Sequence, residues 1–143
     1  MTSINLAQAS TIVDAAIARA RELELTPIAV VVLDAGGNVC LVKREDDAGI
    51  LRVDISHAKA WGTLGLRRGG GTIAENAQKN PVFFATLATI SGGRIATSRG
   101  GVLIRDENAA IIGAIGISGA HAAEDEACAV HGIEAVGLVA DAG

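Results

Sequence analysis

The chain has 143 residues and a formal net charge of −4; it is 50% hydrophobic but only 2% aromatic. This length suits one domain, and we expect residues 1–143 to form it. The acidic balance, the absence of basic runs and the scarcity of aromatic side chains argue against a nucleic-acid-binding protein. No apolar run approaches the ~18 residues of a membrane-spanning helix, which argues against a membrane protein.

So much apolar surface on a small chain predicts burial between subunits, so we expect a homo-oligomer, either a dimer, a tetramer or an octamer. The first residues lack the basic and apolar segments of a signal peptide. Cys40 and Cys128 lie in apolar segments and form no Cys-x-x-Cys pair, which is typical of small buried hydrophobic residues. These features predict a cytoplasmic location.

The first elements are a helix and a hairpin. Apolar residues at spacings of three and four predict an amphipathic helix from Leu6 to about Leu23. Asn5 is its expected N-cap, with Gln8 as the capping-box partner. The short β-branched segment that follows predicts a strand over 28–33, paired across a Gly-rich turn with a second strand over 39–44.

The middle of the chain is expected to be helical. Helical periodicity begins near Asp54, and three consecutive glycines at 69–71 are expected to stop that helix. Thr72 and Glu75 have capping-box spacing and predict a short helix. Asn80-Pro81 places an N-cap and an N1 proline at the start of another helix.

A second hairpin and a final helix complete the chain. Strands are expected over 102–105 and 111–117, and a helix begins near His121 with acidic residues in its first turn. The order therefore predicts an α+β fold. We expect one antiparallel sheet of about four to five strands from two hairpins, the N- and C-terminal helices on one face, and a helical block between the hairpins.

The most unusual stretch is the Gly-rich strand before the last helix. Side chains alternate along a strand, so Ala114, Gly116 and Ser118 share a face that is almost bare. A bare face permits close packing of a helix, or it forms the floor of a ligand site. The glycine spacing does not match a dinucleotide fingerprint.

Two residues of the middle helix are candidates for chemistry. Lys59 lies in a largely apolar segment, where desolvation would lower its pKa and make it a nucleophile or an anion contact. The alternative is that it reaches solvent or pairs with a carboxylate. His57 is a candidate general base or iron ligand, and the alternative is a histidine packed on Trp61.

Other polar residues gather at the last helix and beside loops. His121, Glu124 and Asp125 do not supply a recognisable metal-ligand set, so we predict no metal site; capping and the helix dipole explain the acids. Three arginines in or beside loops could bind a carboxylate, or are solvated or interface residues: Arg44, Arg94 and Arg99.

Several segments together resemble a known family. They are Asp34-Ala35-Gly36-Gly37, Lys43-Arg44-Glu45-Asp46, Asp54-Ile55, Lys59-Ala60-Trp61, Gly100-Gly101-Val102-Leu103-Ile104, and Ile112 to Gly119 followed by Asp125-Glu126. By their order and spacing the chain resembles the GlcG/HbpS family, which also occurs as the C-terminal domain of PduO-type proteins.

The resemblance implies a flattened antiparallel sheet flanked by helices, and dimers that assemble into larger rings or octamers. It also implies haem as a candidate ligand, because some members bind haem or have haem breakdown attributed to them. The chain departs from the family at Glu45, where the usual residue is methionine. It has no tyrosine and no methionine beyond Met1, and none of its histidines or cysteines matches a family haem ligand.

Two functions of different classes follow. The first is a small-molecule-binding protein for haem or another flat anionic ligand, in a subunit-interface pocket between the helix of Lys59 and the Gly-rich strand. Arg44 and Lys59 would hold its carboxylates. The remaining expected ligand-binding residues are Asp54, Gly101, Gly116, Ser118 and Asp125.

The second is a small catabolic enzyme (a tautomerase, lyase or hydrolase) in which Lys59, His57 and Glu124 act on a carboxylated intermediate. An accessory protein without chemistry is the third possibility. No cofactor other than haem is indicated.

Overall fold

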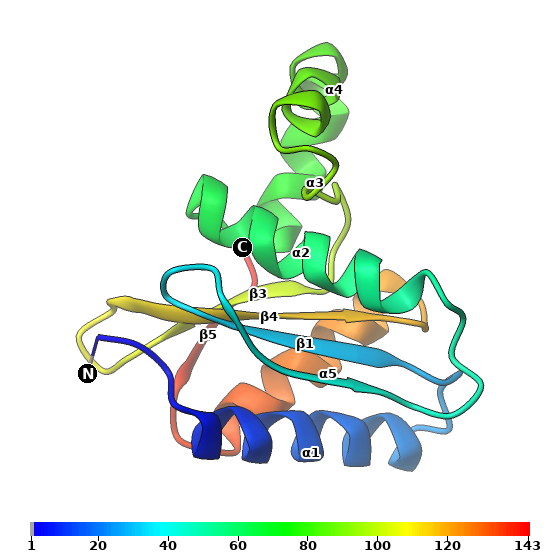
Figure 1. Cartoon of the computed structure of the whole chain (residues 1–143), viewed down its shortest axis with the longest axis vertical. Coiled ribbons are helices and arrows are strands. Elements are labelled where there is room, and N and C mark those ends of the chain that lie inside the picture. The colour runs from blue at the N-terminus through cyan, green and yellow to red at the C-terminus, as the bar shows by residue number, and fades with distance from the viewer. Residues whose placement is uncertain (1) are drawn as a thin grey trace.

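The computed structural model describes residues 2–143, which form one antiparallel sheet with helices on both faces (Figure 1). The strands are β1 (Ala29–Asp34), β2 (Val39–Arg44), β3 (Gly101–Arg105), β4 (Ile111–Ser118) and β5 (Val139–Asp141). Their order in the sheet is β2-β1-β4-β3-β5. The α+β architecture and the two predicted hairpins, β1-β2 and β3-β4, are confirmed.

The two hairpins join through their inner strands. β1 runs antiparallel to β4, with Val31 opposite Gly116, so the Gly-rich strand lies in the middle of the sheet. The edge strand β5 was not predicted, because three residues are too few to show an alternating pattern. It pairs with β3, and the ion pair of Arg105 Nη2 with Asp141 Oδ2, 2.9 Å apart, accompanies this pairing.

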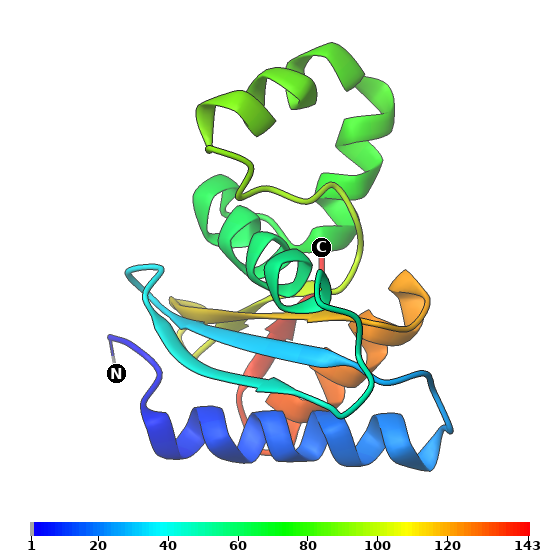
Figure 2. The same cartoon turned by 45° about the vertical axis from the view of Figure 1, so that its right-hand side comes forward.

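Helices α1 (Leu6–Glu22) and α5 (Ala122–Glu134) cover one face of the sheet, as predicted (Figures 1 and 2). The capping box at the start of α1 is present: Gln8 N donates to Asn5 Oδ1 at 2.8 Å, and Asn5 N donates to Gln8 Oε1 at 3.2 Å. The main hydrophobic core lies between these helices and the sheet. Cys128 is buried there, whereas Cys40 is only partly buried.

Helix α2 (Arg52–Leu66) packs on the other face, directly against the Gly-rich strand. A Cβ atom on Gly116 would collide with the backbone oxygen of Ser56, and one on Gly101 would collide with that of Lys59. These glycines therefore let a helix backbone approach the strands closely. The bare strand face is a helix-packing surface, which is the first of the two interpretations offered by the sequence.

Helices α3 (Gly70–Lys79) and α4 (Pro81–Ile90) extend away from the sheet (Figure 2). The predicted break between two helices and the short second helix are present, but the boundary and the capping role of Thr72 are wrong, because α2 ends at Leu66 and α3 already begins at Gly70. The reason is tertiary. Gly70 lies against the backbone of Gly101, and Gly71 N donates to Ala142 O at 2.8 Å, so glycine is needed inside the helix.

Helix α4 is apolar but largely uncovered. Pro81 occupies its N-terminal position, as predicted, and Phe84 is its only residue that is buried. The exposed fractions of Val82, Phe83 and Ile90 are 81%, 56% and 72%. Across residues 2–143, none of the helices combines the length and the apolar character needed to cross a membrane.

Candidate functional site

Helix α2 divides the candidate residues between its inner and outer faces. On the inner face, the Lys59 ammonium donates to Ile117 O at 2.8 Å and lies 3.2 Å from Asp125 Oδ2. The side chains of this ion pair are only 4% and 2% exposed. Asp125 Oδ1 also accepts from Ala120 N at 3.0 Å. The pair therefore joins α2, β4 and α5 beneath the surface.

Burial dominates the acid–base behaviour of this pair. Desolvation lowers the pKa of Lys59, and the nearby charge of Asp125 opposes that shift. Desolvation likewise raises the pKa of Asp125, opposed by the charge of Lys59. Each group is most costly to bury when charged, and the partner offsets part of that cost. Lys59 therefore pairs with a carboxylate, one of the alternatives that the sequence left open.

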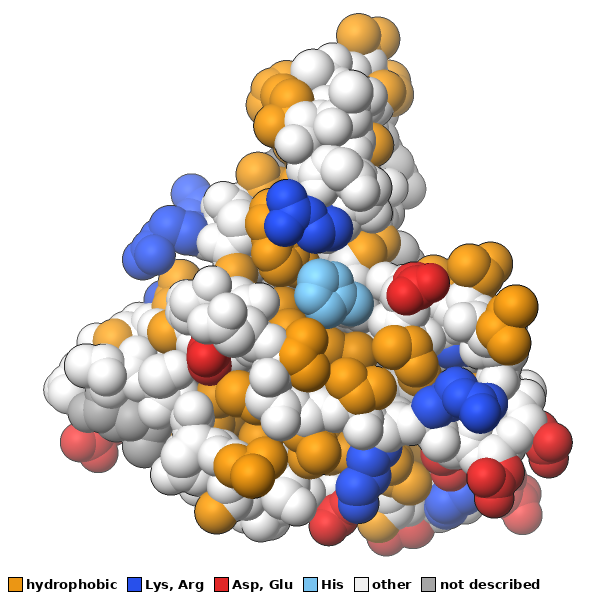
Figure 3. Space-filling view, in the orientation of Figure 1, with side chains coloured by type: hydrophobic (Ala, Val, Ile, Leu, Met, Phe, Trp, Pro, Cys, Tyr) orange, Lys and Arg blue, Asp and Glu red, His pale blue; other side chains and the backbone are white. Residues whose placement is uncertain are grey.

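The outer face of α2 forms a hollow of about 320 Å³, lined by Asp54, His57, Ala58, Gly93 and Arg94. Arg94 is held in place because its Nε donates to Ser91 O at 2.7 Å and its guanidinium lies over Trp61, 4.1 Å from the ring centroid. On the side of the molecule drawn in Figure 3, hydrophobic side chains surround a histidine, and side chains of Lys or Arg lie near it.

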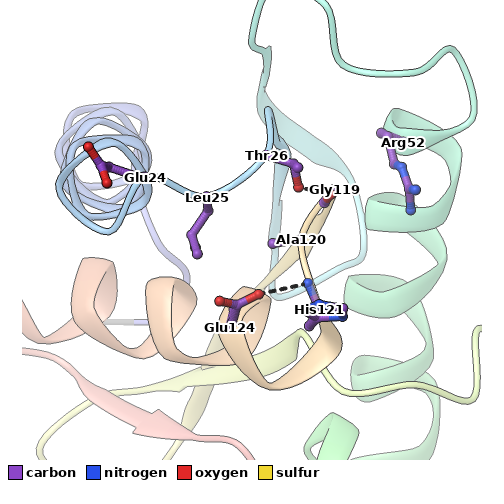
Figure 4. A pocket seen from close by; sticks show the side chains of 8 residues that line it. All are labelled: Glu24, Leu25, Thr26, Arg52, Gly119, Ala120, His121 and Glu124. Carbon is purple, nitrogen blue, oxygen red and sulfur yellow. Dashed lines mark hydrogen bonds between the residues drawn. The ribbon is translucent and has the colours of Figure 1, made fainter.

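Another hollow, of about 480 Å³, lies at the end of the sheet between the two helical layers (Figure 4). Its walls include Glu24, Thr26, Arg52, Ala120, His121 and Glu124. Arg52 Nη1 donates to Ser118 Oγ at 3.1 Å, and Glu124 Oε1 accepts from His121 N at 3.1 Å. The second bond is the expected capping interaction at the start of α5.

The three residues expected to share catalysis do not meet. His57 lies in the outer hollow with Asp54, Lys59 is enclosed with Asp125, and Glu124 lines the hollow at the end of the sheet. The expected pocket between α2 and the Gly-rich strand is filled by the backbone of α2 over Gly101 and Gly116.

The remaining expected ligand-binding residues also separate. Ser118 is 1% exposed and accepts from Arg52. Arg44 ends β2, where its Nη1 donates to Ala48 O at 2.8 Å, outside both hollows. Arg99 Nε lies 3.4 Å from Glu126 Oε1. Sequence reasoning missed Arg52, because its role depends on Ser118 and on α5.

A family model described as "Haem degrading protein HbpS-like" matches residues 4–134. The chain belongs to this HbpS-like family. The resemblance seen in the sequence is thereby confirmed. Among relatives, the chain is 34% identical over 125 residues to a 15.0 kDa protein of the dhaT-dhaS intergenic region of Citrobacter freundii, covering 87% of this chain and 86% of that protein.

Solved structures share the HbpS-like fold. The Klebsiella pneumoniae protein ORFY superposes with a TM-score of 0.86 at 30% identity, over 96% of this chain and 92% of that one. A complex of PduOC with haem superposes with a TM-score of 0.85 at 24% identity, over 95% and 96% of the two chains. At this lower identity the likeness concerns the fold alone.

Proposed function

We propose that this HbpS-like protein binds a flat anionic small molecule, with haem as the first candidate, in the hollow on the outer side of α2. The observation that carries the proposal is that His57 and Arg94 line the same hollow. A histidine imidazole is a common axial ligand of haem iron, and a guanidinium forms charge-assisted hydrogen bonds with propionate groups. The family and the haem complex of a protein with this fold support the choice of ligand.

The residues around the hollow fit such a ligand chemically. Ala58 gives the hollow an apolar wall for contact with a macrocycle, and Arg94 stands beside it with its guanidinium supported by the Trp61 ring. His57 would hold haem here through its imidazole, and Arg94 would hold a propionate. Lys59 does not serve as the second carboxylate contact, because its ammonium is already bonded to Ile117 and Asp125.

A second copy of the chain is the expected cover of this site. The hollow is smaller than a porphyrin, so a single chain leaves one face of the macrocycle in water. Close by in the sequence, α4 ends just before Gly93 and Arg94, and its last residue, Ile90, is 72% exposed. Exposed apolar surface of this kind marks an interface, so we propose a homo-oligomer in which α4 packs near the ligand.

Hemin titration followed by Soret absorbance, with native mass spectrometry for stoichiometry, tests the proposal. We expect saturable binding that His57→Ala weakens at least about tenfold and Arg94→Gln by about tenfold, the effect of losing one charge-assisted bond. His121→Ala, in the other hollow, is the matched control and should bind hemin like the wild type. Unchanged Soret titration of His57→Ala would refute the site, and no saturable binding by the wild type would refute haem.

A further inference from the structure

The hollow at the end of the sheet is built from both helical layers. Arg52 comes from the first turn of α2, on one face of the sheet. Glu24 follows α1 and Glu124 lies in the first turn of α5, both on the opposite face. Figure 4 shows Arg52 on one side of the space and Glu124 across from it, whereas Glu24 lies at the rim with its carboxylate directed away from the space. Charges of opposite sign therefore stand on opposite walls.

None of these three charged side chains is neutralised by the protein itself. Within the described part of the chain, residues 2–143, the ion pairs closer than 4.0 Å do not include Arg52, Glu24 or Glu124. Arg52 is nevertheless oriented, because one of its nitrogen atoms donates to the buried hydroxyl of Ser118. Its other donors stay available for a bidentate contact with a carboxylate.

The floor of the hollow is hydrogen-bonded to its surroundings and carries no net charge. Gly119 and Ala120 form it, and Thr26 Oγ1 donates to Gly119 O at 2.6 Å. The amide of Ala120 donates to Asp125, whose charge is balanced by Lys59 directly below the surface. The charges that a ligand meets are therefore those of the walls: the Arg52 guanidinium on one side and the Glu124 carboxylate on the other.

From this arrangement we infer that the hollow binds a small zwitterion of the amino-acid class, with its carboxylate on Arg52 and its ammonium group on Glu124. A simple anion would gain the contact with Arg52 but would face the carboxylate of Glu124, and a simple cation would face the guanidinium. A molecule with both charges satisfies both walls. This site is separate from the outer face of α2, so the result of its test does not depend on whether the protein binds haem.

The test is a ¹⁵N-¹H NMR titration of the full-length protein with free amino acids, whose side chains range in size from that of glycine to that of arginine. Chemical shifts are monitored at the amides of Gly119, Ala120 and His121. L-Alanine is compared with propionate, which lacks the ammonium group, and with ethylamine, which lacks the carboxylate. We expect saturable shifts with at least one amino acid. For L-alanine, each truncated analogue should bind at least about tenfold more weakly, as expected for losing one charged contact.

Three variants and one control locate the binding. Arg52→Gln should weaken it at least about tenfold. Glu124→Gln should weaken it too, although its amide oxygen can still accept from His121 N. Glu24 has a φ of 54°, a conformation that favours glycine, so Glu24→Gly should raise Tm; because its carboxylate is directed away from the space, it should weaken binding less than Glu124→Gln does. Arg94→Gln, on the outer face of α2, should have no effect on amino-acid binding.

Several outcomes would overturn the inference. If no free amino acid produces saturable shifts at the three amides, the hollow is not a zwitterion site. If propionate binds as tightly as L-alanine, it is a plain anion site. If Arg52→Gln binds like the wild type, the carboxylate is held elsewhere.

Discussion

The two faces of α2 are built from neighbouring residues but have opposite characters. Ser56 and Lys59 point into the protein, where the backbone of the helix touches glycines of β3 and β4. His57 and Trp61 lie on the other side, where they are only partly buried and border hollows. Successive residues of an α-helix differ by about 100° in direction, so one step along the chain separates a packing residue from one that borders an open hollow.

This contrast between the inner and outer faces of α2 indicates where a ligand can be accommodated on this fold. On the inner face, close packing against glycines and a buried ion pair leave no room for a ligand beside the strand. On the outer face, an imidazole and a guanidinium line one open hollow, so polar groups are available to a ligand there. Three kinds of experiment test this difference between the two faces of α2: adding a side chain on the inner face, removing charge there, and changing the pH.

The largest expected effect comes from adding a side chain at Gly116. We expect Gly116→Val to lose at least about 4 kcal/mol of unfolding free energy, or not to fold, because its Cβ would occupy the position of the Ser56 carbonyl group. The matched control is Gly65→Ala on the outer face, whose Cβ would make an ordinary 3.6 Å contact with the Trp61 ring.

The control should be neutral or gain about 0.5–1 kcal/mol, because alanine favours a helix over glycine. Urea denaturation measures both variants. Equal stability losses at the two positions would mean that the two faces of α2 do not differ as described.

The next effect comes from breaking the buried ion pair. Lys59→Met and Asp125→Leu should each cost about 3–5 kcal/mol, because each leaves an uncompensated buried charge. The double variant should cost clearly less than the sum, since neither charge is then buried. A double-mutant cycle from urea denaturation measures this coupling. Additive losses would show that the two groups do not stabilise one another.

The smallest expected effect is a pH dependence of the same pair. The pKa of Asp125 is raised in the folded state, so its contribution to stability is greatest below 3.8 and is lost as the pH rises through the raised value. The pKa of Lys59 is lowered, so its contribution is greatest above 10.5 and is lost as the pH falls through the lowered value.

The unfolding free energy of the wild type minus that of the double variant should therefore be lowest at intermediate pH. It should rise towards both extremes, by at most about 1.4 kcal/mol per pH unit for each group. Urea denaturation at a series of pH values measures this difference. A flat difference would mean that neither pKa is shifted on folding.

Much of the fold was predictable because its signals are local. The capping box of Asn5 and Gln8, the strand limits of β2 and the alternation of small residues along β4 depend only on near neighbours in the sequence. Local signals misled at Thr72, whose capping-box spacing lies inside α3. There the position of the helix start depends on contacts of Gly70 and Gly71 with β3 and the C-terminal segment.

The sequence by itself therefore determined the element types, the hairpins, the family and the polar residues worth considering, since periodicity, caps and turns act over a few residues. Only the tertiary structure decided which of those residues meet. Lys59 and Asp125 are 66 positions apart, as are Arg52 and Ser118, and His57 reaches Arg94 only through the return of the chain after α4. Such contacts depend on how closely helix and strand backbones approach, and no local pattern encodes that distance.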